Sequence, residues 1–243
     1  MGAIPVPPNR TIEEHIATQA EFKAQKRNPV LVEAQAGQRD VFFVDAAHFV
    51  RGAFLCCVWC FVRMMIRGAS GRQRYNVLGE WNAVTRQLIR ISNVTRVSSD
   101  TMVEPLVKIA AVKTRATTLV LDNARYQHCA KVEAGAQRLG IDLLFLTSYS
   151  PNLNVIERLW KFTKKRALRG KTYPDFDAFR AAIDDCLDKT ATDYQEEIKT
   201  LMTLKFQTFD KASFLAVESI IAMTTSSPMS VNPFFLRTEH LPK

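Results

Sequence analysis

Residues that bind zinc or cross-link secreted proteins are scarce in this sequence. Its 243 residues include four histidines and five cysteines, an odd number without a framework spacing. A disulfide-stapled secreted domain is therefore not expected. Cys57 and Cys60 have the spacing of half a zinc knuckle, but no second pair of cysteines or histidines follows at a useful distance. Both lie in an apolar run, which favours buried strand cysteines over a zinc site.

Long hydrophobic runs are missing as well. The longest, at residues 53–62, is ten residues between Arg51 and Arg63, whereas a membrane-spanning helix needs about 20. The amino terminus has no charged-then-apolar signal pattern. These absences predict a soluble intracellular protein, and we expect it in the cytoplasm.

The charge balance is strongly positive. The formal net charge is +9 and the pI is near 9.5. Such a surface favours a polyanionic partner, because each phosphate that a basic residue neutralises releases condensed counterions. A basic protein without a nucleic-acid partner remains the alternative, since net charge alone is a weak signal.

The pattern of apolar segments predicts an α/β domain with a mixed β-sheet flanked by helices. Strands are expected at residues 41–45, 54–66, 75–79, 84–91, 117–121 and 141–146. Helices are expected at residues 11–27, 100–113, 129–139, 150–168, 175–189 and 196–204. Several strands in succession, followed by alternating helices and strands, imply a layered architecture. Asn82 is expected at the bend between the third and fourth strands.

Two acidic residues come at the carboxyl ends of apolar strands. Asp45 ends the first predicted strand, and Asp122 follows the strand at residues 117–121. Ligands bind at this edge of an open α/β sheet, and an unpaired carboxylate is costly inside a packed strand. Capping of the following loop is the alternative for either residue alone. Two such residues in one chain favour metal binding.

Glu157 is the third candidate acid. The predicted helix that carries it has five residues on one apolar face: Leu153, Ile156, Trp160, Thr163 and Ala167. Glu157 falls on the flank of this face, from which it can reach a neighbouring strand end. An ordinary first-turn glutamate, favoured by the helix dipole, is the alternative.

Three converging carboxylates suit hard cations such as Mg²⁺, which prefers oxygen ligands. Two such ions about 4 Å apart can activate the attacking oxygen and stabilise the leaving oxygen of a phosphoryl displacement. A zinc site rich in histidine or thiolate is not available in this part of the sequence.

Basic residues crowd around the same helix. Six of the eleven positions from 161 to 171 are basic: Lys161, Lys164, Lys165, Arg166, Arg169 and Lys171. A second cluster precedes the strand at residues 75–79: Arg63, Arg67, Arg72 and Arg74. Together they could track a DNA backbone past the acids. A solvated helix end that complements the macrodipole is the alternative.

Three sequence blocks resemble the catalytic blocks of the DDE superfamily transposases, and most closely the bacterial insertion-sequence branch of the mariner superfamily. They are FVDAAH at residues 43–48, LVLDNARYQH at 119–128 and YSPNLNVIERLW at 149–160. Asp122 and Glu157 are separated by 34 residues, the spacing that this branch typically shows. The segment RYNVLG at 74–79 is also similar to a family block.

The resemblance implies a ribonuclease H-like catalytic domain at residues 40–209, after a helix and linker at 1–39 and before a tail at 210–243. It implies that Asp45, Asp122 and Glu157 hold two Mg²⁺ or Mn²⁺ ions. Such enzymes cut double-stranded DNA at transposon ends and join the freed 3′-hydroxyl to target DNA. They generally act as dimers on paired ends, here at a bacterial nucleoid.

Further side chains receive supporting roles from the resemblance. Asn123 and His128 support the second block, while Asn152 and Asn154 set the start of the Glu157 helix. Ser150 as N-cap, with Pro151 at the first helical position, gives that start a physical reason. His48 is either a support for the acids or a satisfied structural histidine.

One departure from the family concerns the recognition of transposon ends. Family members carry paired helix-turn-helix units before the catalytic domain, whereas only about forty residues precede Asp45. Three interpretations of this departure are open: the chain is the product of a split element, a truncated copy of a transposase, or an isolated domain. A non-catalytic DNA- or transposase-binding regulator and a repurposed nuclease are the functional alternatives.

Overall fold

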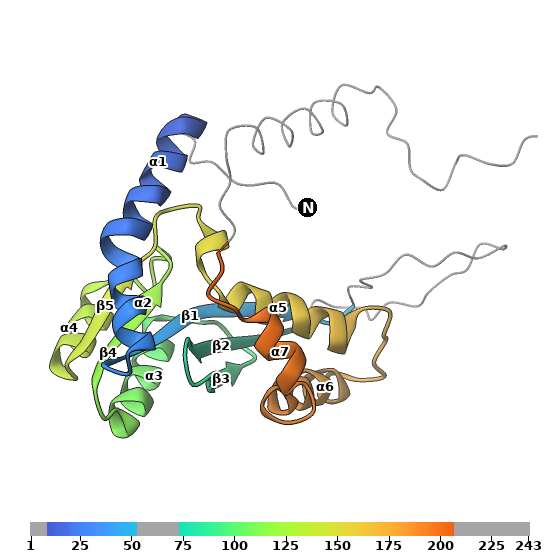
Figure 1. Ribbon diagram of the computed structural model, residues 1–243. Helices are drawn as coiled ribbons and strands as arrows, with labels where there is room; N and C mark the ends of the chain where they lie inside the picture. Colours follow the sequence, from blue (N-terminus) through green and yellow to red (C-terminus); the bar gives the residue numbers. More distant parts are fainter. Residues whose placement is uncertain (1–8, 53–72, 207–243) are drawn as a thin grey trace, which may run out of the picture. The chain divides into compact units, whose positions relative to one another are not determined.

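Five strands form one mixed sheet in the order β3–β2–β1–β4–β5 (Figure 1). The computed structural model describes residues 9–52 and 73–206, and residues 18–207 form one compact unit of the chain. The strands are β1 (Arg39–Val50), β2 (Arg74–Asn82), β3 (Leu88–Asn93), β4 (Ala116–Leu121) and β5 (Ile141–Phe145). β1 pairs antiparallel with β2 and parallel with β4. The predicted mixed sheet is therefore confirmed.

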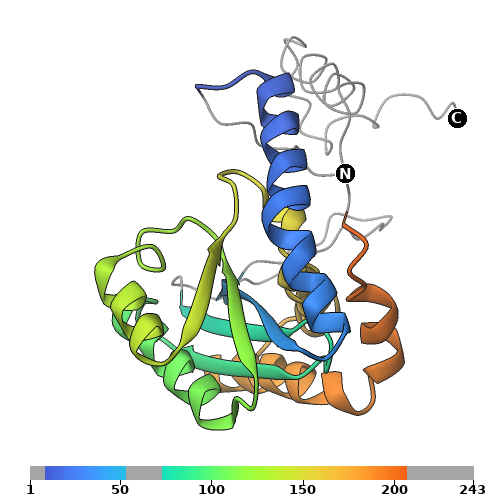
Figure 2. The ribbon, with the colours of Figure 1, turned by 60° about the vertical axis from the view of Figure 1, so that its left-hand side comes forward.

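Helices cover both faces of this sheet (Figure 2). The α-helices are α1 (Ile12–Phe22), α2 (Asn28–Gln35), α3 (Ser99–Val112), α4 (Ala130–Arg138), α5 (Ile156–Thr163), α6 (Phe176–Asp188) and α7 (Gln195–Leu201). One hydrophobic core lies between the sheet and α3 and α4, and a second lies between the sheet and α2, α5, α6 and α7. None of the described helices is long and apolar enough to cross a membrane.

The two cores explain why β1 is nearly continuously apolar. Side chains alternate between the faces of a strand, and here both faces are covered. Phe42 and Val44 belong to the core under α3 and α4, whereas Phe43 and Phe49 belong to the other core. In a strand that is buried on both faces, apolar residues do not alternate with solvent-facing polar residues.

The expected end of the first strand at Asp45 is wrong, because β1 continues to Val50. Its antiparallel neighbour β2 pairs with it as far as Val50 opposite Arg74. Its parallel neighbour β4 pairs only as far as Phe43 opposite Val120. Asp45 therefore lies just beyond the end of the parallel half of the sheet, where a ligand can approach.

The predicted bend at Asn82 is confirmed and lies between β2 and β3. Its Oδ1 accepts hydrogen bonds from the backbone N–H groups of Val84 and Thr85, both at 2.9 Å. Val84 and Thr85 belong to this turn and not to the strand expected at residues 84–91. The observed strand, β3, therefore begins only at Leu88. The strand expected at 54–66 lies outside the described residues, as do Cys57, Cys60 and three of the arginines, Arg63, Arg67 and Arg72.

The helix expected at residues 11–27 continues to Gln35. A capping box opens it: Thr11 N–H donates to Glu14 Oε2 at 2.9 Å, and Glu14 N–H donates to Thr11 Oγ1 at 3.2 Å. A π-helical turn at Lys23–Arg27 leads directly into α2. Pro29 does not end the helix, and it lies in the first turn of α2, directly after the π-helical turn.

Candidate active site

Asp45 lies in the middle of the sheet, opposite Gly79 of β2. Its Oδ2 accepts a hydrogen bond of 2.9 Å from the indole Nε1 of Trp160 in α5. Burial, together with the negative charges of Glu157 and, to a lesser extent, Asp122, raises the pKa of the Asp45 carboxyl to about 7. A carboxylate in this position is thus crowded by like charges, and a bound cation would relieve that repulsion.

Asp122 comes directly after β4, as predicted. Its Oδ1 accepts a 2.9 Å hydrogen bond from the backbone N–H of Ala124, so it also caps the loop that follows. Burial raises the pKa of its carboxyl, while the Ala124 N–H opposes that shift. The two interpretations of this residue, loop cap and functional acid, are compatible.

Glu157 lies in the first turn of α5 on the flank of its buried face. All five residues of that predicted face are buried: Leu153, Ile156, Trp160, Thr163 and Ala167. Burial raises the pKa of Glu157, whereas the positive charges of Lys161 and Lys164 lower it. The two lysines are therefore close enough to act on this carboxylate, as the helical spacing predicts.

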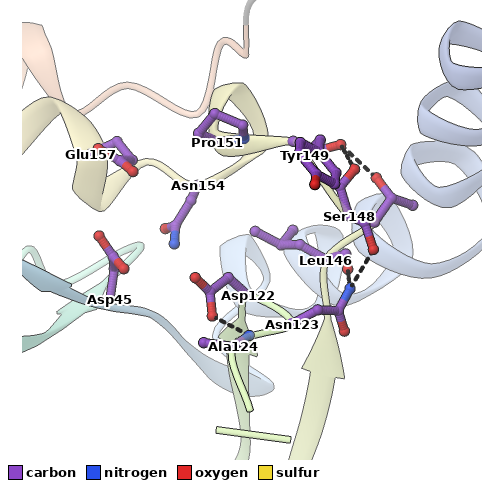
Figure 3. A pocket seen from close by; sticks show the side chains of 12 residues that line it. Asp45, Asp122, Asn123, Ala124, Leu146, Ser148, Tyr149, Pro151, Asn154 and Glu157 are labelled. Atoms are coloured by element: carbon purple, nitrogen blue, oxygen red, sulfur yellow. Dashed lines mark hydrogen bonds between the residues drawn. The ribbon is translucent and has the colours of Figure 1, made fainter. Parts of the chain in front are cut away.

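The three acids line one cavity of about 320 Å³. Figure 3 shows their carboxylates pointing into a common space from β1, from the end of β4 and from the start of α5. The remaining lining comes from Asn123, Ala124, residues 146–151 and Asn154. Acids that are far apart in the sequence thus meet where the parallel strands end.

Two asparagines join the segments around this cavity. Asn154, which is buried, donates its Nδ2 to the backbone carbonyl of Val44 at 3.1 Å. Asn123 donates its Nδ2 to the carbonyl of Leu146 at 2.5 Å and so joins the ends of β4 and β5. Both side chains were predicted from the family resemblance to support the acids, and they line the cavity.

The start of the Glu157 helix differs from the expected continuous helix at 150–168. A short 3₁₀ turn (Pro151–Leu153) precedes α5, and a π-helical turn (Lys164–Leu168) follows it. Ser150 does not cap with its side chain, because its hydroxyl accepts from Gln19 Nε2 at 2.9 Å. Asn152 donates to Gln19 Oε1 at 3.1 Å. Contacts with α1 thus take the place of the predicted local cap.

Two predicted supporting histidines lie elsewhere. His48 is three residues after Asp45 and projects from the other face of β1, where its Nδ1 donates to Asn76 Oδ1 at 2.6 Å. His128 stacks on Phe145 with ring centroids 4.2 Å apart. The described lining of the cavity includes neither ring.

The predicted DNA-binding residues that the structure describes are exposed. Lys161, Lys164 and Lys165 are exposed on α5 and the turn after it, and Arg166 beside them pairs with Glu197. Arg74 is exposed at the start of β2. Arg72 lies outside the described residues.

Trp160 and Gly79 were not predicted as site residues. The helical spacing indicates only that Trp160 is buried, because periodicity does not show what an indole N–H will meet. A glycine inside a strand often marks a close approach of another element, and this signal was available at Gly79.

The donor set fits a divalent cation in its chemistry, since it consists of three mutually repelling carboxylates. Within residues 9–52 and 73–206, no three His, Cys, Asp or Glu side chains are arranged around a single ion position. The carboxylates surround a shared space rather than one point.

Part of the chain is similar to a known protein family. Residues 63–180 match the DDE superfamily endonucleases. Asp122 and Glu157 of the DDE motif lie inside this segment, whereas Asp45 precedes it, so the assignment of Asp45 depends on the geometry of the cavity. No curated protein matches the sequence.

Solved structures of a mariner transposase share the fold of this chain. The Mos1 strand transfer complex has a TM-score of 0.57 at 12% identity and is matched over 92% of this chain. The chain spans 65% of that transposase's length. The Mos1 paired end complex with Mg has a TM-score of 0.55 at 11% identity, over 92% of this chain and 66% of the other. The catalytic domain of Mos1 transposase is covered completely, with a TM-score of 0.51 at 10% identity over 83% of this chain. These likenesses confirm the predicted ribonuclease H-like fold.

Proposed function

We propose that this chain is the catalytic domain of a transposase, which cuts DNA at transposon ends and transfers the freed strand to target DNA. One observation carries the proposal: Asp45, Asp122 and Glu157 line a single cavity at the end of the parallel strands. The DDE family match and the shared fold with Mos1 transposase support it. The bacterial insertion-sequence origin and the cytoplasmic location remain predictions.

The three carboxylates would hold divalent cations, Mg²⁺ or Mn²⁺, and we propose two ions for each site. Bound ions would supply an activated oxygen nucleophile and stabilise the leaving oxygen of the DNA strand. The protein's own residues hold the carboxylates in place. Trp160 binds Asp45, the Ala124 N–H binds Asp122, and Asn154 ties the start of the Glu157 helix to β1.

The DNA would pass over the exposed lysines beside the cavity. Lys161 and Lys164 lie on the same flank of the helix as Glu157, and their charges act on it. Lysines in this position would bind phosphates and so place the scissile bond at the acids. By analogy with the paired end complexes of Mos1, we propose a homodimer on two double-stranded transposon ends.

The test uses the purified chain, Mn²⁺ and a supercoiled plasmid. Wild-type protein should nick the plasmid, and Asp122→Asn should abolish nicking without changing the circular dichroism spectrum. Nicking by Asp122→Asn at the wild-type rate would contradict the proposal. Joined products with a linear donor duplex would identify a strand transferase, whereas nicking alone would identify a repurposed nuclease.

A further inference from the structure

Trp160 connects the helix of one acid to the strand of another. Its indole Nε1 donates to Asp45 Oδ2 at 2.9 Å, across 115 positions of sequence. Trp160 is three residues after Glu157, and side chains at this spacing are neighbours on a helix surface. One short helix therefore brings a carboxylate to the cavity and a hydrogen-bond donor to the carboxylate opposite.

The indole is buried between two close neighbours. It is 2% exposed, and its ring meets the ring of Phe49 edge-on, with centroids 6.3 Å apart. Below it lies Gly79, where an added Cβ would be only 2.7 Å from Trp160 Cη2 and 3.0 Å from Cζ2. Gly79 is also the β2 partner of Asp45. The absence of a side chain at Gly79 thus allows the indole to reach across β2 to the carboxylate.

We infer that Trp160 is a positioning residue for Asp45, and that Gly79 is required for this role. The inference rests on the proposed function of Asp45 as a metal ligand. An ionised carboxylate has about four lone-pair positions on two oxygens. The indole N–H occupies one of them on Oδ2, the backbone N–H of Ala46 donates to the same carboxylate, and together the two donors restrict its rotation.

Without the indole donor, the Asp45 carboxylate would keep the bond from the Ala46 backbone N–H but would turn more readily away from Glu157 and Asp122. Removing a hydrogen-bond partner of a metal ligand typically lowers the metal affinity by about 10- to 100-fold. Trp160→Phe keeps an aromatic ring in the core and removes the donor together with part of the indole. Gly79→Ala keeps Trp160 in the sequence but displaces its ring. Two unrelated substitutions should therefore have the same effect on Asp45.

The experiment measures Mn²⁺ binding by calorimetry. Trp160→Phe and Gly79→Ala should each weaken binding by about 10- to 100-fold. Phe162→Leu is the matched control, because Phe162 is buried on the same helix but packs against Tyr194, and it should bind Mn²⁺ like the wild type. Wild-type affinity in Trp160→Phe would overturn the inference, whether or not Gly79→Ala folds.

A metal-free measurement separates positioning from general packing. The indole N–H proton of Trp160, assigned by its loss in Trp160→Phe, should shift upfield in Asp45→Ala and stay unchanged in Phe162→Leu. An unchanged resonance in Asp45→Ala would also overturn the inference. Loss of Mn²⁺ binding in Asp45→Asn, with wild-type affinity in Trp160→Phe, would reject the positioning role alone. Wild-type affinity in Asp45→Asn would reject the proposed metal site itself.

Discussion

Asn154 donates its side-chain amide to the backbone carbonyl of Val44 at 3.1 Å. This bond fixes the segment before Glu157 to the strand residue before Asp45. Because Asn154 Oδ1 also accepts from the backbone N–H of Ile156 at 3.4 Å, one side chain holds both the strand and the start of α5. The distance between two of the three acids therefore depends on a residue that carries no charge.

Asn154→Ala should lower the free energy of unfolding by about 1–3 kcal/mol, since it leaves the buried Val44 carbonyl without its partner. It should also reduce nicking activity, because the Glu157 helix loses its tie to β1. Urea denaturation and the plasmid assay measure the two effects. Asn152→Ala is the control: its amide bonds to a side chain of α1, so its effect on nicking should be smaller. Equal loss of nicking in both variants would contradict the role of Asn154.

Glu80 should make the stability of the protein fall with rising pH. Its side chain is fully buried, and neither carboxyl oxygen has a hydrogen-bond partner among the described residues. Burial raises its pKa well above the usual value, so the folded state retains a proton that the unfolded state loses above about pH 4.3. The stabilisation is complete below that pH and is lost as pH rises through the folded pKa.

Thermal unfolding of Glu80→Gln across pH tests this. The variant should gain stability relative to the wild type as pH rises, because the amide does not ionise. Glu196→Gln, at an exposed position in the first turn of α7, should follow the wild-type curve closely. A constant difference between Glu80→Gln and the wild type at all pH values would show that Glu80 does not titrate this way.

Asp45 should also destabilise the metal-free protein near neutral pH. Its folded pKa of about 7 is above the unfolded value of about 3.9. Its contribution is therefore complete below about pH 4 and is lost as pH rises through about 7. In chelator, Asp45→Asn should be more stable than the wild type at pH 8, as measured by scanning calorimetry. Mn²⁺ should raise the melting temperature of the wild type and leave that of Asp45→Asn unchanged.

Lys161 and Lys164 should determine the salt dependence of DNA binding. Replacing both by glutamine should lower the slope of log affinity against log salt concentration by about 2, close to 0.9 for each lost phosphate contact. Fluorescence anisotropy with a duplex at several salt concentrations measures this slope. Lys131→Gln is the control, since Lys131 lies on α4 and pairs with Asp100. An unchanged slope in the double variant would place the DNA elsewhere.

Local patterns were sufficient for much of the fold and part of the site. The apolar run before Asp122 is a buried strand, and the five-residue face of the Glu157 helix is buried as predicted. Both features follow from the periodicity of apolar residues and from the high free-energy cost of burying an unpaired carboxylate. The closeness of Lys161 and Lys164 to Glu157 follows from the same helical spacing.

Long-range pairing decided what periodicity could not. β1 passes beyond Asp45 because β2 pairs with it as far as Val50, and this pairing is not encoded in either strand alone. His48 projects away from the acids because it is an odd number of residues from Asp45. A strand that ended at Asp45 would have left the direction of His48 open.

The sequence by itself thus determined the class of fold, the three acids and the helix flank on which Glu157 lies, because these follow from residue type and local period. Only the tertiary structure decided that Trp160 binds Asp45 over Gly79 and that Asn154 binds Val44. Those bonds join residues more than 100 positions apart. They depend on the register between strands and on the packing of α5 across the sheet, neither of which a local pattern specifies.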